Sequence, residues 1–385
     1  MAFKIKVGWI TISRRILLGA LILLLGLRLF HILDIVSYNQ DSQSHWLRGR
    51  PVKNEAQNLP LCNSNETGTR ILAGIFNKLH RQTKPPPNIL LIGSYGRSGT
   101  SFLGGLLKSI PGVFYYYEPL YNLEQWHMLT RPLAVQSLKD LFICNFTGPV
   151  FTAIKERGKN YIRNKYMETC GSKSTCLEST RLSSACSSEP IRMIKTIRMR
   201  LSWLEPLLHD TKLDLRVIHI LRDPRGAVIS NWKAGWDIPA ETLCGNLLED
   251  LETAQDILKR FPNRYVAVRY EDICADAKRI ANIVFHFLGY ANLLPSANRF
   301  LTRMTSEEAG DEYSLRRNTS QQLQQWRTKI TEEELKKIET TCSKAINKLG
   351  FHLFRNINNT RNLSIPLYNQ TSFNPLFGYR DCVNV

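Results

Sequence analysis

An apolar run that leads directly into a glycine- and hydroxyl-rich loop constrains this chain more than any other stretch. The run is NILLIG at 88–93, and SYGRSGTSFLGGLLKS follows it at 94–109. The run is typical of a buried strand, and the stretch from Thr100 to Lys108 is typical of a helix. This order predicts an anion site, because the first amide groups of a helix are unpaired and its dipole is positive there.

The loop lacks the features of a nucleoside triphosphate site. A Walker loop places a lysine directly after its second glycine, and a hydroxyl residue after that lysine. No lysine follows Gly99 here; the loop cation is Arg97, and Thr100 and Ser101 supply the hydroxyl groups. The sequence therefore predicts a phosphate or sulfate site, with a capped glycine turn as the alternative.

Further apolar stretches predict an α/β fold. Four of them are typical of strands, at 113–117, 191–197, 215–221 and 265–273. Helical stretches lie between and after them, including 245–261 and 331–350, the last with a capping box formed by Thr331 and Glu334. Strands that alternate with helices predict a parallel β-sheet flanked by helices on both faces.

A second anion site is predicted where the strand at 215–221 ends. The segment RDPRGAVIS spans 222–230, and Pro224 is well placed to begin a helix. Arg222 then lies at the ligand-binding edge of the sheet, and Ser230 lies about two helical turns further on. Bidentate recognition by arginine suits a phosphate dianion. Two anion sites in one parallel sheet indicate a ligand with phosphates at both ends, whereas RDP alone is also typical of a surface turn.

The amino terminus predicts a membrane anchor. Residues 1–15 contain basic residues and no acid, and residues 16–33 are apolar apart from Arg28 and His31. We interpret 1–15 as a cytoplasmic tail and 16–33 as a signal-anchor transmembrane helix, which places the rest of the chain in a lumen or outside the cell. A cleaved signal peptide and a buried helix are the alternatives. Residues 34–87 are then a stem, 88–355 the catalytic domain and 356–385 a tail rich in asparagine.

Charge and cysteine content agree with a lumenal domain. The formal net charge is +18, with basic residues spread along the chain, so we expect a polyanionic partner. In a lumen that partner is not nucleic acid. The nine cysteines form no CxxC pair and have no histidines at metal-ligand spacing, so we expect no metal. We expect disulfides to close the serine-rich loop at 170–186, with at least one thiol left free or intermolecular because nine is odd.

Several motifs together resemble one enzyme family. SYGRSGTSF, FYYYEPLYNL, MIKTIRM, VIHILRDPRGAVIS, VRYED and RRNTSQQLQQWR occur in the order and spacing of the Golgi carbohydrate 6-O-sulfotransferases, over about 88–353. The chain is most similar to the branch that sulfates galactose or N-acetylgalactosamine in keratan and chondroitin. The resemblance implies a P-loop-like sulfotransferase fold, type II topology in the Golgi membrane, and 3′-phosphoadenosine 5′-phosphosulfate as the sulfuryl donor.

The resemblance also implies roles for individual residues. The 5′-phosphosulfate site corresponds to Arg97, Ser98, Gly99, Thr100 and Ser101, with Phe102 near the adenine. Arg222 and Ser230 match the residues that bind the 3′-phosphate. Tyr270 matches an aromatic residue beside the base, with a core tyrosine as the alternative. Arg316 and Arg317 resemble a basic segment that closes over the nucleotide, although Asn318 begins a glycosylation sequon there.

Sulfuryl transfer requires a base and cations. Glu118, in YYYEPL, is the candidate base, and we expect the tyrosines around it to raise its pKa. A glutamate that caps the following turn is the alternative. Lys195 and Arg198 are expected to assist the sulfuryl group or bind an acidic acceptor, while Arg97 stabilises charge on the leaving phosphate.

The sequence thus predicts a donor-dependent, metal-free transfer of sulfate to the 6-hydroxyl of a sugar. Galactose and N-acetylgalactosamine are the expected acceptors, and N-acetylglucosamine stays open. The expected partners are a glycan or glycosaminoglycan and the Golgi membrane, and a homodimer is left open. A metal-free lumenal glycosyltransferase and a non-catalytic glycan-binding membrane protein are the alternatives; the chain contains no Asp-x-Asp motif of manganese-dependent glycosyltransferases.

Overall fold

The computed structural model describes residues 87–305, 322–368 and 376–377. The chain divides into two compact units, 1–61 and 62–385, and the described residues belong to the second. The predicted cytoplasmic tail, the predicted span at 16–33 and the stem up to residue 86 lie outside the described residues. Arg316 and Arg317 also lie outside them. Among the helices that are described, none is both long enough and apolar enough to cross a membrane.

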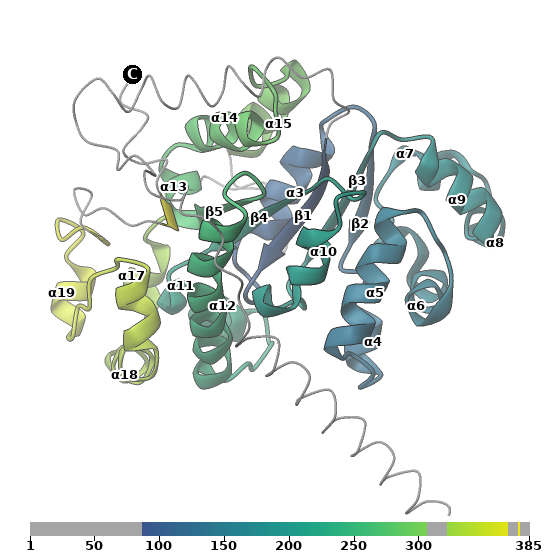
Figure 1. The fold of residues 1–385 in the computed structure, drawn as a ribbon. Coiled ribbons are helices and arrows are strands. Elements are labelled where there is room, and N and C mark those ends of the chain that lie inside the picture. Colours follow the sequence, from purple (N-terminus) through teal and green to yellow (C-terminus); the bar gives the residue numbers. More distant parts are fainter. Residues whose placement is uncertain (1–86, 306–321, 369–375, 378–385) are drawn as a thin grey trace, which may run out of the picture. The chain divides into compact units, whose positions relative to one another are not determined.

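The centre of the domain is a parallel sheet of five strands in the order β2-β3-β1-β4-β5 (Figure 1). The strands are β1 (Asn88–Gly93), β2 (Val113–Tyr117), β3 (Ile191–Thr196), β4 (Leu215–Leu221) and β5 (Tyr265–Arg269). All five predicted strands are present, and every pairing is parallel. The prediction of a strand at 265–273 was wrong at its end. The chain enters helix α13 at Tyr270, because Glu271 and Asp272 stabilise the first turn of a helix.

Helices connect the strands and follow them. They are α3 (Thr100–Lys108), α4 (Tyr121–Gln125), α5 (Arg131–Phe142), α6 (Gly148–Arg157), η1 (Gly158–Asn160), α7 (Lys165–Thr169), α8 (Lys173–Cys176), α9 (Ser179–Ser187), η2 (Leu201–Trp203), α10 (Glu205–His209), α11 (Pro224–Lys233), α12 (Ala240–Arg260), α13 (Tyr270–Ala275), α14 (Ala277–Phe287), α15 (Pro295–Thr305), α17 (Gln325–Lys329), α18 (Glu332–Lys348) and α19 (Ile357–Arg361).

The two faces of the sheet bury different residues of the same strand. Ile89 and Leu91 pack with α3, α14 and α15, whereas Leu90 and Ile92 pack in the larger core that includes residues of α5, α12 and α18. Figure 1 shows α14 and α15 on the opposite side of the sheet from α10 and α12. Because side chains alternate along a strand, a strand buried on both faces is continuously apolar. This explains the NILLIG run.

Helix termini follow local signals. The predicted capping box at the start of α18 is confirmed, with Thr331 and Glu334 bonded reciprocally. Helix α11 begins at Pro224, as predicted. Helix α12 begins at Ala240, earlier than the predicted start at 245, because an apolar row that includes Leu243 already faces the core there.

Three disulfides close the described domain. They join Cys144 to Cys186, Cys170 to Cys176 and Cys244 to Cys342. The expected closure of the 170–186 segment is therefore present, but the segment contains α8 and α9 and is not a plain loop. Among the described cysteines, Cys274 is free and buried.

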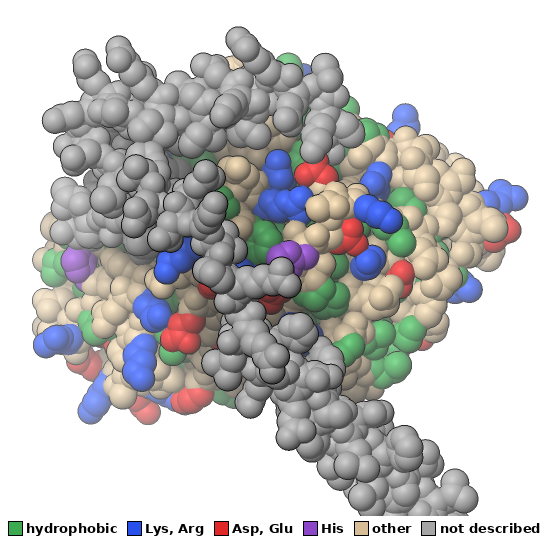
Figure 2. Space-filling model, in the orientation of Figure 1, with side chains coloured by type: hydrophobic (Ala, Val, Ile, Leu, Met, Phe, Trp, Pro, Cys, Tyr) green, Lys and Arg blue, Asp and Glu red, His purple; other side chains and the backbone are tan. Residues whose placement is uncertain are grey.

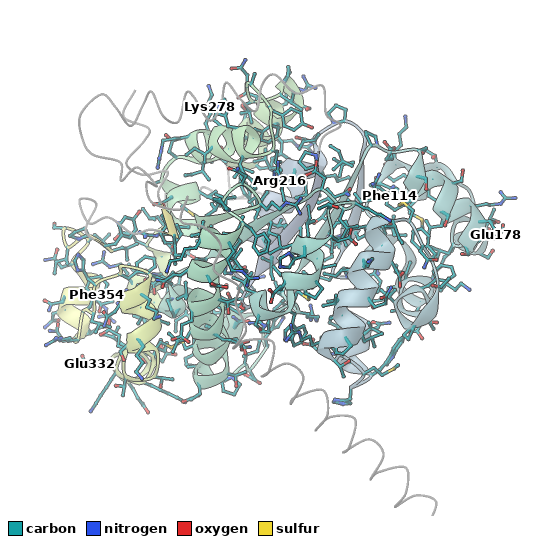
Figure 3. The ribbon with its side chains drawn as sticks, viewed as in Figure 1. Phe114, Glu178, Arg216, Lys278, Glu332 and Phe354 are labelled. Carbon is teal, nitrogen blue, oxygen red and sulfur yellow. A yellow bond between two sulfur atoms is a disulfide. The ribbon has the colours of Figure 1, made fainter. Side chains whose placement is uncertain are left out.

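A buried arginine holds the start of α11 against the carboxyl-terminal helices. The Arg225 guanidinium is fully buried, and it pairs with Asp223 on its own helix and with Glu339 of α18. It also donates a hydrogen bond of 2.7 Å to the carbonyl oxygen of His352. Its Cζ atom lies 4.8 Å from the ring centres of Trp326 and Phe354, the latter labelled in Figure 3. The segment that carries Arg222 is thereby fixed to the core.

The segment predicted to be an asparagine-rich tail begins at 356, and most side chains of 356–368 are exposed. This stretch contains α19 and packs on the core. Arg327 is buried beneath it and donates hydrogen bonds of 2.6 and 2.7 Å to the carbonyl oxygens of Thr360 and Asn362. The Tyr368 hydroxyl donates to Asp272 at 2.8 Å. Buried hydrogen bonds of this kind tie α17 to the carboxyl-terminal segment.

Replacing Arg225 by methionine should lower the free energy of unfolding by about 3–5 kcal/mol, because two buried carboxylates lose their cation. Arg260→Met is the matched control. Its ion pairs with Glu205 and Asp256 are solvent-exposed, so a loss below about 1 kcal/mol is expected. Urea unfolding followed by tryptophan fluorescence measures both. Equal losses for the two variants would show that the buried pairing of Arg225 does not hold this part of the fold.

Candidate active site

The predicted site residues meet around one cavity at the carboxyl ends of the strands. Its volume is about 530 Å³, which is in the range of small-molecule sites. The predicted residues in its wall are Arg97, Gly99, Thr100, Ser101, Phe102, Glu118, Lys195, Arg198, Arg222, Ser230 and Tyr270. Ser98 is buried in the same loop. The structure thus brings together the predicted residues that it describes.

The first loop depends on glycine at its turn into α3. Gly99 has φ of 93° and precedes the first residue of that helix. A Cβ atom at Gly99 would collide with the ring of Tyr270, so this ring packs directly on the turn. Tyr270 is therefore a wall residue shared with the loop, and the alternative of a plain core tyrosine does not describe it. The turn leaves the first amide groups of α3 at the cavity.

Two buried donors in the predicted anion loops have no partner among the described residues. They are the Ser98 hydroxyl in the first loop and the Nε atom of Arg222 in the second. Leaving a buried donor unpaired costs about 1–3 kcal/mol, so such groups call for a ligand. One orphaned donor lies in each predicted anion loop. This arrangement fits a ligand that carries two anionic groups.

The two loops also contact each other. Arg97 donates from Nε to the Ser230 hydroxyl at 3.1 Å, and Arg222 donates from Nη1 to the backbone oxygen of Arg97 at 2.5 Å. The guanidinium of Arg222 lies 4.3 Å from the Tyr270 ring. The structure therefore places Arg97 beside the predicted 3′-phosphate residues as well as in the 5′-phosphosulfate loop. The loops form one continuous basic wall.

Glu118 lies at the end of β2 within a cluster of cations. Its carboxylate accepts hydrogen bonds from Lys195 Nζ, from Arg198 Nη1 at 2.7 Å and from the Ile197 amide at 3.3 Å. Arg198 also pairs with Glu124 at 2.6 Å. The side chain does not cap the following turn, so that alternative is excluded.

The expected rise in the pKa of Glu118 was wrong. Burial raises the pKa, but the Lys195 ammonium and the Arg198 guanidinium outweigh burial and hold the pKa of the carboxyl below its ordinary value. Lys195 lies on β3, far along the chain, so the sequence around Glu118 gave no sign of it. The carboxylate is ionised throughout the neutral range.

Tyr117 links the donor loop to this cluster, and the sequence analysis did not single it out. Its hydroxyl and the Ser101 hydroxyl are 3.1 Å apart, and Lys195 lies 4.6 Å from its ring. Burial raises the pKa of the phenol, but Lys195, the hydrogen bond with Ser101 and Arg163 together bring it below its ordinary value. Its place directly before Glu118 in FYYYEP was the available signal.

Two tryptophans in the wall were also missed. Trp326 is buried, and its indole N–H has no partner among the described residues. It lies near the end of the motif RRNTSQQLQQWR, in which the sequence analysis assigned roles only to Arg316 and Arg317. The ring of Trp236 covers Gly96, where any Cβ atom would overlap it. Nothing in the local sequence marks Trp236.

A buried acid lies behind the second loop. Glu271 accepts a hydrogen bond of 3.0 Å from the Asp223 amide, and its other oxygen has no partner among the described residues. Burial and the neighbouring Asp223 carboxylate raise the pKa of Glu271 to about 7, although Arg222 opposes them. The described residues contain no cluster of three or more histidine, cysteine or acidic side chains able to hold a metal ion.

The family model and the curated relatives that match this chain are all sulfotransferases. The sulfotransferase domain family model matches residues 86–350. Carbohydrate sulfotransferase 3 of Mus musculus is 26% identical, with 72% of this chain and 71% of that protein covered. Carbohydrate sulfotransferase 1 of Danio rerio is 24% identical, covering 74% and 83%. A solved sulfotransferase domain from the curacin biosynthetic pathway aligns with a TM-score of 0.42 and 14% identity, covering 70% of this chain and 100% of that domain.

The raised pKa of Glu271 predicts a pH-dependent stability. Between its ordinary value of 4.5 and about 7, the folded protein keeps a proton that the unfolded chain has lost. Stability therefore falls as pH rises through this window, by up to about 1.4 kcal/mol per pH unit. Glu271→Gln abolishes this loss, so the variant should gain about 2–3 kcal/mol relative to the wild type between pH 4.5 and 7.5.

Urea unfolding at several pH values measures the difference. Glu241→Gln, at an exposed position of α12, is the control and should follow the wild type at every pH. A difference in the free energy of unfolding between Glu271→Gln and the wild type that stays constant with pH would contradict the raised pKa of Glu271.

Proposed function

Because the chain belongs to the carbohydrate sulfotransferases of the sulfotransferase domain family, we propose that it transfers a sulfuryl group from 3′-phosphoadenosine 5′-phosphosulfate to the 6-hydroxyl of a sugar. Galactose and N-acetylgalactosamine in keratan or chondroitin chains are the proposed acceptors. The family match supports a sulfotransferase over the glycosyltransferase and the non-catalytic glycan-binding protein considered earlier.

The choice of sulfuryl donor rests on the unpaired hydrogen-bond donors, one of which lies in each of the two anion loops. Ser98 and the amide groups at the start of α3 suit the 5′-phosphosulfate, and Arg222 with Ser230 suits the 3′-phosphate. Phe102 and Tyr270 line the same cavity and offer aromatic surface to the adenine. The donor supplies an activated sulfuryl group, and no metal is needed for its transfer.

Stabilisation of the leaving phosphate falls to Arg97 and the start of α3. The charge on that phosphate grows as the bond from sulfur to the bridging oxygen breaks. Fixed amide groups and a permanent cation stabilise such charge without reorganisation. Lys195, buried at the end of β3, is placed to offset charge on the sulfuryl oxygens.

Glu118 is the proposed base. The acceptor oxygen forms a bond to sulfur in line with the leaving phosphate, and its proton passes to the Glu118 carboxylate. The low pKa makes Glu118 a weaker base than expected, but it keeps the carboxylate ionised and able to accept a proton at neutral pH. Lys195 holds it at the junction between the donor loop and the open side of the cavity.

We further propose that the protein is a type II Golgi membrane protein anchored by 16–33. Protease added to sealed Golgi vesicles should then spare the chain beyond about residue 34. Digestion of the catalytic domain in sealed vesicles would contradict this topology.

The transfer reaction itself tests the proposed function. The full chain is incubated with radiolabelled donor and, separately, with desulfated keratan, chondroitin and glycans that end in N-acetylglucosamine. We expect label at the 6-position of galactose or N-acetylgalactosamine. Label at another position, or only on N-acetylglucosamine, would contradict the proposed acceptor.

Arg222→Ala should weaken binding of 3′-phosphoadenosine 5′-phosphate by about 2–4 kcal/mol, because a charge-assisted contact is lost. Binding of adenosine 5′-phosphate, which lacks the 3′-phosphate, should hardly change. Titration calorimetry measures both. Arg216→Ala, which removes an arginine paired with Asp214 outside the cavity wall, is the control. Equal losses for the two nucleotides would indicate that Arg222 supports the fold instead.

Glu118→Gln should lower kcat by roughly 10²–10⁴, because the side chain keeps its shape but cannot take a proton. Affinity for the product nucleotide should stay within about twofold. In the wild type, the loss of activity caused by protonation of Glu118 should begin only below its ordinary value of 4.5, since its pKa is lowered.

Glu124→Gln provides the matched control, since Glu124 also pairs with Arg198 but does not line the cavity. It should retain kcat within about threefold. Arg97→Ala should instead lower turnover and donor binding together. A Glu118→Gln variant with more than about a tenth of wild-type kcat would assign the base to another group.

A further inference from the structure

The cavity wall contains cations in addition to those of the two loops that are proposed to bind the sulfuryl donor. Its described residues include the single carboxylate Glu118, which is already paired with Lys195 and Arg198. Arg157 and Arg163 lie in the same wall, and no described carboxylate forms an ion pair with either. Both come from the segment around η1, away from the loops that follow β1 and β4.

Backbone pairing fixes this segment beside β2. Ile162 forms an antiparallel bridge with Tyr116. The Arg163 amide donates to the Tyr115 oxygen at 3.0 Å, and the Tyr117 amide donates to the Tyr161 oxygen at 2.6 Å. Arg163 therefore lies beside the residue that precedes Glu118, at a place set by the main chain.

Each guanidinium stacks on tyrosine. Arg163 lies 3.3 Å from the centre of the Tyr117 ring, and Arg157 lies 4.2 Å from that of Tyr121. Tyr161, 5.5 Å from Arg157, is held by two hydrogen bonds of 2.9 Å with Asn122. Stacking orders an arginine while its N–H edge stays available for a planar or tetrahedral anion.

The order of the sheet relates these cations to the reaction. The donor loops follow β1 and β4, Lys195 ends β3, and Glu118 follows the edge strand β2. Arg157 and Arg163 lie beyond Glu118 on the β2 side. Glu118 and the two arginines line the same cavity, so this side of the cavity is where the residue next to a sugar bound at Glu118 would meet the two arginines.

We propose that Arg157 and Arg163 form an acceptor subsite for an anionic group, a carboxylate or a sulfate, on the sugar adjacent to the one that is modified. The subsite rests on the proposed function and narrows its substrate class to acidic glycans. It selects acceptors by charge, whereas Glu118 acts on the hydroxyl.

Acceptors that differ in this charge test the subsite in the full chain. Chondroitin supplies a carboxylate, partly sulfated keratan supplies a sulfate, and fully desulfated keratan supplies neither. In the Arg157→Gln/Arg163→Gln variant, KM should rise at least tenfold for whichever charged acceptor the wild type uses. Its kcat should change less than threefold, and kinetics with desulfated keratan should change less than twofold. Arg163→Lys, which keeps the charge, should recover part of the loss.

Lys155→Gln is the matched control, since Lys155 is a cation stacked on Phe151 of the same helix, at 4.4 Å, but outside the cavity wall. It should behave as the wild type. An equal rise in KM for neutral and charged acceptors, or no rise at all, would overturn the subsite. Direct titration with a chondroitin oligosaccharide measures binding without catalysis. It therefore separates failure of the subsite from failure of the proposed function. Binding that falls tenfold in the double variant without any sulfate transfer would support the subsite and contradict the function; binding that does not fall would overturn the subsite.

Discussion

The carboxyl ends of five parallel strands meet at one edge of the sheet, and each strand delivers a group to the same cavity. The loop that contains Arg97 follows β1, Glu118 follows β2, Lys195 lies near the end of β3, Arg222 follows β4 and Tyr270 follows β5. The pairing register fixes their heights, with Tyr117 opposite Lys195 and Leu91 opposite the same lysine on its other side. A one-residue slip of a strand would move each of its side chains to the opposite face of the sheet and disrupt the packing on both faces. The pairing register therefore fixes which residues reach the cavity.

The charges of the cavity are arranged for an anionic ligand. Its described wall contains many cations and one carboxylate, and two of its buried donors lack partners. Buried groups of this kind cost stability in the free protein, and the cost is recovered when an anion binds. On the face drawn in Figure 2, acidic side chains are interspersed with basic ones among the described residues. The net charge of +18 thus describes the chain, whereas the positive charge of the cavity comes from the buried Lys195 and from arginines that are half-buried or exposed.

Local patterns predicted the sheet and both anion loops. Continuous apolar runs identified the strands, and glycine next to hydroxyl residues identified the turn at Gly99. The pKa of Glu118 was not predictable from its neighbours, because it depends on Lys195, which is 77 residues away in the chain. The roles of Trp236 and Arg163 depend in the same way on contacts across the fold. The prediction of a strand through 273 missed the start of α13 at Tyr270, where Glu271 and Asp272 stabilise the first turn of the helix.

A structure determined with 3′-phosphoadenosine 5′-phosphate bound tests the central claim most directly. We expect the 3′-phosphate within hydrogen-bond distance of Arg222 Nε and the Ser230 hydroxyl. The 5′-phosphate should lie against the Ser98 hydroxyl and the first amides of α3, on the side that faces Lys195. A nucleotide bound in the reverse direction, or outside this cavity with both orphaned donors still unpaired, would contradict it.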